Sequence, residues 1–172
     1  MKKHTLHLGV LLALVMLLVT MSVPAFAETG DVEINAINFP DGIFREIVSF
    51  FDADKSNTLS TTEIAAAKTL ICYNKGIKDL TGIEHFTALT SLQCDYNELT
   101  ALDISKNTAL TNLSCVKNQL TVLDVSRNAD LKRLVCFGNK LTTLDVGNNT
   151  ALETLYCGSN ELTALDVSKN TE

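Results

Sequence analysis

The chain has no tryptophan, only three histidines and few basic residues for its 172 residues. Its 14 Lys and Arg are outnumbered by 20 Asp and Glu, and no basic cluster lies beyond the extreme N-terminus. The positive surface that holds phosphate backbones is therefore missing, which argues against nucleic acid as a partner. His4 and His7 lie in a segment that we expect to be removed, so His85 is the one imidazole available to a catalytic triad. We expect a protein that is not an enzyme, and the absence of tryptophan weakens a carbohydrate-stacking role.

The N-terminus has the three parts of a secretory signal peptide. Lys2 and Lys3 precede an apolar stretch over residues 8–23, and Ala25-Phe26-Ala27 follows as a small-x-small cleavage site. The apolar stretch is shorter than the roughly 20 residues that span a bilayer. We predict a signal peptide over residues 1–27, no membrane insertion of the mature chain, and a secreted or cell-surface location.

The clearest signal is a tandem repeat of 21 residues, with regular copies over 89–109, 110–130, 131–151 and 152–172. Each copy follows L-x-x-L-x-C-x-x-N-x-L, and the region resembles the leucine-rich-repeat superfamily. Leu92 and Cys94 are two residues apart, so they point to the same side of a strand, and stacked copies give a parallel sheet. Each coil buries its apolar columns only against its neighbours. A divergent coil over 70–88 precedes the regular ones, with a spacing of 22 between Leu70 and Leu92.

Further columns recur in every coil. The second half of each copy echoes the first, so we expect short extended segments and little helix on that side, with Leu99, Leu102 and Ile104 facing inward. Two asparagine columns are expected to turn inward and bond the backbone of adjacent coils. They are Asn97, Asn118, Asn139 and Asn160, and then Asn107, Asn128, Asn149 and Asn170.

One inward cysteine per coil, at 72, 94, 115, 136 and 157, indicates buried thiols acting as small hydrophobes, although neighbours in register are close enough for occasional oxidation. For the outward column Asp103, Asp124, Asp145 and Asp166, we favour backbone bonding and nearby Lys or Arg over a second metal site.

Upstream of the repeats lies a helix–loop–helix pattern. Phe44, Ile47, Val48 and Phe51 have helical spacing, with a start at Pro40-Asp41-Gly42. Residues 52–63 read DADKSNTLSTTE, and Ile64 to Ala67 with Leu70 indicate a short exiting helix. The loop matches the EF-hand calcium pattern, in which hard oxygens converge on one ion. The candidate calcium ligands are Asp52, Asp54, Ser56, Ser60 and Glu63 by their side chains and Thr58 by its backbone carbonyl.

Position 6 of this loop departs from the pattern, because Asn57 stands where EF-hands have glycine. Asparagine tolerates positive φ, so the turn is expected to survive at some cost. With three carboxylates, we expect a calcium affinity on the order of 10⁻⁴ to 10⁻³ M. The alternative is a solvated acidic turn between two helices.

The combination of signal peptide, EF-hand-type segment and leucine-rich coils resembles bacterial secreted or surface proteins of the internalin-like class. The resemblance implies a helical cap on the array and a protein partner on the concave sheet. The loop also resembles dockerins, which carry two copies where this chain has one. We predict an α+β repeat fold, with an EF-hand-like cap over 28–69 and a leucine-rich-repeat solenoid of parallel strands over 70–172. The expected function is protein binding with calcium as cofactor. A structural or display module without its own partner, and a dockerin-like docking module, stay open as alternatives.

The candidate partner surface comprises the outward strand positions, where the copies differ while their core columns do not. Val116, Val135, Phe137 and Tyr156 are expected to form an exposed apolar patch of the kind that protein-binding hot spots use. The full candidate set is Gln93, Asp95, Val116, Arg133, Val135, Phe137 and Tyr156. The sequence stops at Glu172 without a polar terminal coil, so we also expect either a fragment or association through the open end.

Overall fold

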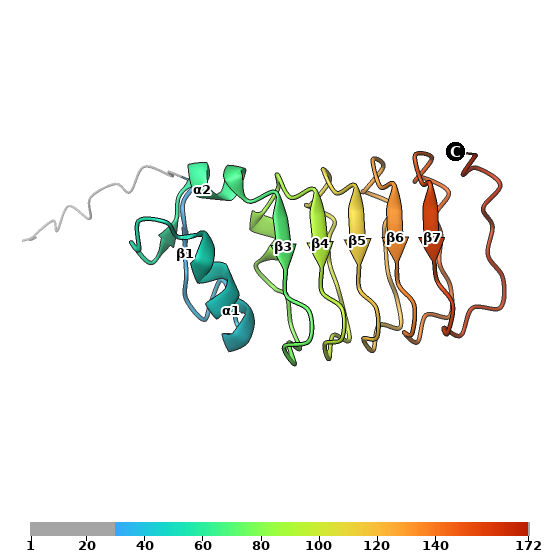
Figure 1. The fold of residues 1–172 in the computed structure, drawn as a ribbon, viewed down its shortest axis with the longest axis horizontal. Coiled ribbons are helices and arrows are strands. Elements are labelled where there is room, and N and C mark those ends of the chain that lie inside the picture. Colours follow the sequence, from blue (N-terminus) through green and yellow to red (C-terminus); the bar gives the residue numbers. More distant parts are fainter. Residues whose placement is uncertain (1–29, 172) are drawn as a thin grey trace, which may run out of the picture.

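The computed structural model describes residues 30–171, which form a small helical cap followed by a row of stacked coils (Figure 1). The predicted signal peptide lies outside the described residues. Within them, no helix has the length and apolar character needed to cross a bilayer.

The cap contains a two-stranded antiparallel ladder and two short helices. Its elements are β1 (Val32–Glu33), α1 (Gly42–Val48), the 3-10 turn η1 (Ser49–Phe51), β2 (Thr58–Leu59) and α2 (Thr61–Ala66). Asp41 starts α1 by accepting hydrogen bonds at Oδ1 from the backbone N–H groups of Ile43 and Phe44, at 2.9 and 3.0 Å. The predicted helix start is therefore confirmed. The exiting helix ends at Ala66, so the expectation that Leu70 extends it is wrong, because Leu70 pairs in the first strand of the array.

The array is a five-stranded parallel sheet in the order β3-β4-β5-β6-β7. Its strands are β3 (Thr69–Ile71), β4 (Ser91–Gln93), β5 (Asn112–Ser114), β6 (Arg133–Val135) and β7 (Thr154–Tyr156). Leu70 pairs with Leu92, Leu92 with Leu113, and Leu113 with Leu134, which reproduces the 22-residue first spacing and the 21-residue repeat. The predicted solenoid of parallel strands is confirmed, and within residues 69–171 the helical content is one 3-10 turn, η2 (Ile83–His85).

The core runs as a rod through the coils. The strand Leu and Cys columns are buried except in the last coil, where Leu155 and Cys157 are half-buried, and Leu99, Leu102 and Ile104 from the return half of the coil are buried too. The return half carries no assigned strand, so its predicted extended segments supply buried side chains without a second sheet. Each coil therefore buries its apolar residues against the next coil, as the repeat predicts.

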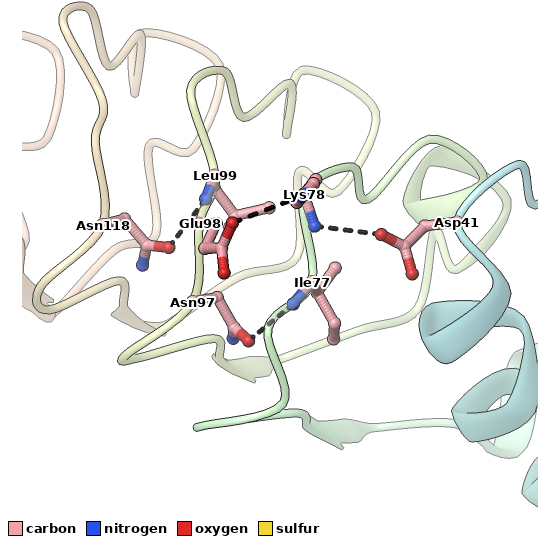
Figure 2. A network of polar contacts seen from close by, with 7 residues as sticks. All are labelled: Asp41, Ile77, Lys78, Asn97, Glu98, Leu99 and Asn118. Carbon is pink, nitrogen blue, oxygen red and sulfur yellow. Dashed lines mark hydrogen bonds and ion pairs between the residues drawn. The ribbon is translucent and has the colours of Figure 1, made fainter.

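Asparagine side chains hold successive coils together. Asn97 Oδ1 accepts from the backbone N–H groups of Lys75 and Ile77, and Figure 2 shows the bond to Ile77. Its Nδ2 donates to the Cys72 and Cys94 carbonyls. Asn118 repeats this one coil further along. The second column also donates across coils, as from Asn128 Nδ2 to the Ile104 and Asn107 carbonyls. The inward turn of both columns is confirmed, although the Oδ1 atoms of the second column are buried without a hydrogen-bond donor among the described residues.

Aromatic rings and one carboxylate join the cap to the first coil. Phe39 is fully buried and packs edge-on against Phe44 and His85, and Phe51 packs against Phe86 at 5.4 Å between ring centroids. Asp41 uses its second oxygen, Oδ2, to accept the backbone N–H of Lys78 at 2.9 Å (Figure 2). One side chain thus caps a helix of the cap and bonds the first coil of the array.

Candidate functional site

The calcium-type loop over residues 52–63 is held between the two cap helices. It begins as η1 ends at Phe51 and closes at Glu63 in the first turn of α2. Leu59, at position 8, is fully buried and pairs antiparallel with Val32 of β1. The upstream segment over β1 therefore supplies the strand partner of this single loop, which the sequence did not reveal.

Three carboxylates converge in the loop. Asp52, Asp54 and Glu63 each offer an oxygen, and these oxygens lie within 4.8 Å of one another. Lys55 and Asn57 both have positive φ, at 58° and 63°, which curls the loop around that point. The positive φ expected at Asn57 is confirmed, and that of Lys55 was not foreseen.

Hydrogen bonds orient these carboxylates. Glu63 Oε1 accepts from the Ala53 N–H at 2.7 Å, and Oε2 accepts from the Ser60 N–H at 2.9 Å. Asp52 accepts through both oxygens, from the N–H groups of Ser56 and Asn57. The pKa of Glu63 is lowered by bonds from Ser60 and Ala53, against the charge of Asp54, and bonds from Ser56 lower the pKa of Asp54. Glu63 and Asp54 are therefore ionised at neutral pH.

The remaining predicted ligands are close by but have local partners. Ser56 Oγ donates to the Thr58 carbonyl at 3.0 Å. Ser60 is the N-cap of α2, and its hydroxyl forms a capping box with Glu63. The loop thus brings together a set of hard oxygen donors of the kind that calcium prefers.

The aspartate column on the return half of the coils, the alternative cation site, is hydrogen-bonded to the backbone. Each aspartate of the column Asp103, Asp124, Asp145 and Asp166 accepts a backbone N–H two residues later, at 2.8 to 2.9 Å. These bonds lower the pKa of Asp103 and Asp166, and the nearby Lys106 and Lys169 act in the same direction. The expectation of backbone bonding with basic neighbours is confirmed.

The five cysteines form the predicted inward column. All are free thiols, and all are buried except the half-buried Cys157. Burial raises the pKa of Cys72 and Cys136 to about 12. These thiols are therefore core residues with little nucleophilic character at neutral pH.

The second candidate site is the outer surface of the sheet, called here the sheet face. It comprises the outward side chains of residues 69–74, 91–96, 112–117, 133–138 and 154–159. Phe137 and Tyr156 are 41% and 56% exposed. Val116 and Val135, predicted to belong to an exposed patch, are only half-buried, so the two rings make up most of its exposed apolar surface.

The polar residues predicted to bind a partner differ in their exposure and in the hydrogen bonds they already make. Asp95 Oδ1 accepts from Ser114 Oγ at 2.6 Å and from the Val116 N–H at 2.7 Å, so this oxygen is committed to the sheet. Gln93 and Arg133 are exposed, and the Arg133 guanidinium lies 5.3 Å from the centre of the Tyr156 ring.

Sequence reasoning missed three exposed apolar side chains on the same face. Ile71 and Tyr73 are 51% and 56% exposed, and Tyr96 is 51% exposed with the Lys117 ammonium 5.2 Å from its ring centre. Ile71 pairs with Gln93, so the outward columns of the regular coils continue into the divergent coil. Extending these columns by one coil would have predicted that Ile71 is exposed on the sheet face. Tyr96 follows the strand in a positive-φ turn, outside the columns considered.

We compared the sequence and the structure with those of known proteins. No protein-family profile matches the chain. Internalin J of Listeria monocytogenes serotype 4b (strain F2365) is 46% identical over 70 residues, which is 40% of this chain and 8% of that protein. The chain thus spans less than a tenth of the length of the curated relatives it matches.

Among solved structures, the functional domain of InlJ from Listeria monocytogenes, described as including a cysteine ladder, is 43% identical with a TM-score of 0.76. The match covers 82% of this chain and 31% of that one. An internalin, inlF, from the same species has a TM-score of 0.60 at 20% identity, covering 80% and 48%, and shows the fold alone. The chain therefore carries an internalin-like leucine-rich-repeat array.

Proposed function

We propose that this protein is a secreted or surface scaffold whose sheet face binds another protein and whose cap loop binds one calcium ion. The observation that supports partner binding most strongly is the gathering of exposed aromatic rings on one face of an otherwise regular array. Phe137 and Tyr156 occupy adjacent coils there, and Tyr73 and Tyr96 lie toward the cap. Exposed aromatic side chains are typical anchors of protein interfaces. The likeness to internalins is consistent with the same role.

The partner-binding proposal is tested by affinity capture with a matched control. Wild type, a Phe137→Ser/Tyr156→Ser double variant and Val122→Ser are immobilised and offered solubilised cell-surface proteins. Val122 is 67% exposed on the return half of its coil, so it controls for loss of an exposed apolar side chain elsewhere. We expect a protein retained by wild type and Val122→Ser but lost from the double variant. Equal capture by all three would favour a display module without its own partner on this face.

The calcium proposal rests on the convergence of three ionised or hydrogen-bonded carboxylates in a helix–loop–helix setting. Asp52, Asp54 and Glu63 would supply the charged oxygens, with Ser56, Ser60 and the Thr58 carbonyl completing the shell. Because the loop lies between α1 and α2, a bound ion would fasten these helices in the orientation that packs Phe51 against Phe86. The role proposed for calcium is therefore a structural clip.

Calorimetric calcium titration tests the clip, with Glu63→Gln as the ligand variant and Glu46→Gln as the control. Glutamine also closes a capping box, so Glu63→Gln removes charge while α2 keeps its start. Glu46 is an exposed carboxylate of α1 outside the loop. With an affinity on the order of 10⁻⁴ to 10⁻³ M, 10 mM calcium should stabilise wild type and Glu46→Gln by about 1.4 to 2.7 kcal/mol. Absent binding, or equal binding by Glu63→Gln, would reduce the loop to a solvated acidic turn.

A further inference from the structure

The charge of the sheet face is opposite to that of the chain. The sequence has a formal net charge of −6. The sheet face, however, carries two cations, Lys117 and Arg133, and one carboxylate, Asp95. Asp95 is half-buried and already accepts two hydrogen bonds from the sheet. The sheet face is therefore a locally positive surface on an acidic molecule.

Neither cation forms an ion pair with another residue of the described range 30–171. Among residues 30–171, the ion pairs are Lys78 with Glu98 and Lys132 with Glu153, and they involve neither Arg133 nor Lys117. Arg133 instead extends over Tyr156, and Lys117 over Tyr96. An aromatic face holds a guanidinium in place while its N–H donors stay available to a planar carboxylate.

Arg133 also borders a hollow in the sheet face. Residues of three adjacent strands surround a hollow of about 270 Å³, namely Ser91, Leu92 and Gln93 of β4, Asn112, Leu113 and Ser114 of β5, and Arg133 of β6. Its rim offers hydroxyl, amide and guanidinium groups, which suits an anionic side chain. The exposed ring of Phe137 belongs to the same coil as Arg133, and that of Tyr156 to the next coil.

We infer that the sheet face binds an extended protein segment in which an acidic side chain enters this hollow beside Arg133 and an apolar side chain packs on Phe137 and Tyr156. The hollow lies over β4 and β5 with Arg133 of β6 at its edge, and Tyr156 belongs to β7, two strands beyond β5. Strands lie about 4.8 Å apart, so these two positions are about 9.6 Å apart. A segment in the extended polyproline II conformation rises about 3.1 Å per residue and presents the same face every third residue, so the two side chains should be about three residues apart. This inference rests on the proposed function and names the chemistry of its partner.

The test is selection of random dodecapeptides displayed on phage against the purified protein, followed by anisotropy titration of the synthetic winners. We expect winners with Glu or Asp about three residues from an aromatic or large aliphatic residue. Replacing that Glu by Gln should weaken binding to wild type about tenfold, as loss of a charge-assisted hydrogen bond does, and have little effect on binding to Arg133→Gln. Lys132→Gln is the matched control, because this exposed cation pairs with Glu153 outside the sheet face.

The outcomes separate this inference from the proposed function. Winners that require Phe137 but show no preference for acidic residues, or that bind Arg133→Gln as well as wild type, overturn the inference and leave partner binding standing. Failure to enrich any peptide, or binding unaffected by the Phe137→Ser/Tyr156→Ser variant, overturns both. Thermal melts of each variant check that these exposed substitutions leave the fold intact.

Discussion

Replacing Asp41 by alanine should loosen the cap from the array, because this side chain acts in both. Loss of the α1 cap should cost about 1 kcal/mol. Loss of the Oδ2 acceptor for the Lys78 N–H should cost about 1 kcal/mol more. A total of about 2 kcal/mol lowers the melting temperature by about 4–8 °C for a chain of this size.

Two variants separate the contributions of Asp41. Asparagine is as good an N-cap as aspartate, but its Nδ2 cannot accept the Lys78 N–H, so Asp41→Asn should show about half of the alanine effect. Lys78→Ala removes only an exposed ion pair with Glu98, at 3.7 Å, and should cost less than about 0.5 kcal/mol. Melts by circular dichroism measure all three. An Asp41→Asn protein as stable as wild type would refute the role of the Lys78 bond.

The same side chain predicts a pH dependence. Burial acts to raise the pKa of Asp41, but N–H groups of Lys78, Phe44 and Ile43 outweigh it and hold the pKa below the ordinary 3.8. A lowered carboxyl pKa stabilises the folded state fully above the ordinary value, and this contribution disappears as pH falls through the lowered value. The stability difference between wild type and Asp41→Asn should therefore be present at pH 7 and shrink below about pH 4.

Three further predictions concern the array and its junction. Gly82 has φ of 104° and a Cβ there would overlap the Phe39 ring, so Gly82→Ala should destabilise the protein by more than about 2 kcal/mol in a denaturant titration. Asn118→Ala leaves buried backbone donors and acceptors unpaired and should lower the free energy of unfolding by about 3 kcal/mol. Asn128→Ala should cost less, because the Oδ1 of Asn128 accepts no bond among the described residues. Equal costs for the two variants would contradict this ranking. Folded protein at pH 8 should react slowly with a thiol reagent, the half-buried Cys157 first, whereas five thiols should titrate after unfolding.

Most of the array follows from the sequence because its columns repeat. The same position recurs in every coil, so the inward direction of Leu92 or Asn118 is fixed by several copies at once. The oxygen pattern of the loop likewise predicts that Asp52 and Glu63 lie together, as they do in the structure.

The junction between cap and array could not be predicted, because it depends on contacts that occur once. The bond from Lys78 to Asp41 joins residues 37 positions apart, and no repeat marks it. The pairing of β1 with the loop strand β2 is equally non-local. The half-burial of Val116 and Val135 depends on neighbouring side chains, which the strand alternation does not specify.

Photo-crosslinking tests the binding role of the sheet face most directly. p-Benzoylphenylalanine is placed at Gln93, on the rim of the hollow, or at Val122, on the return half of the coil, and each protein is irradiated with solubilised cell-surface proteins. The account predicts a specific adduct from position 93 that is absent from position 122. An adduct from position 122 alone, or the same adducts from both positions, would contradict it.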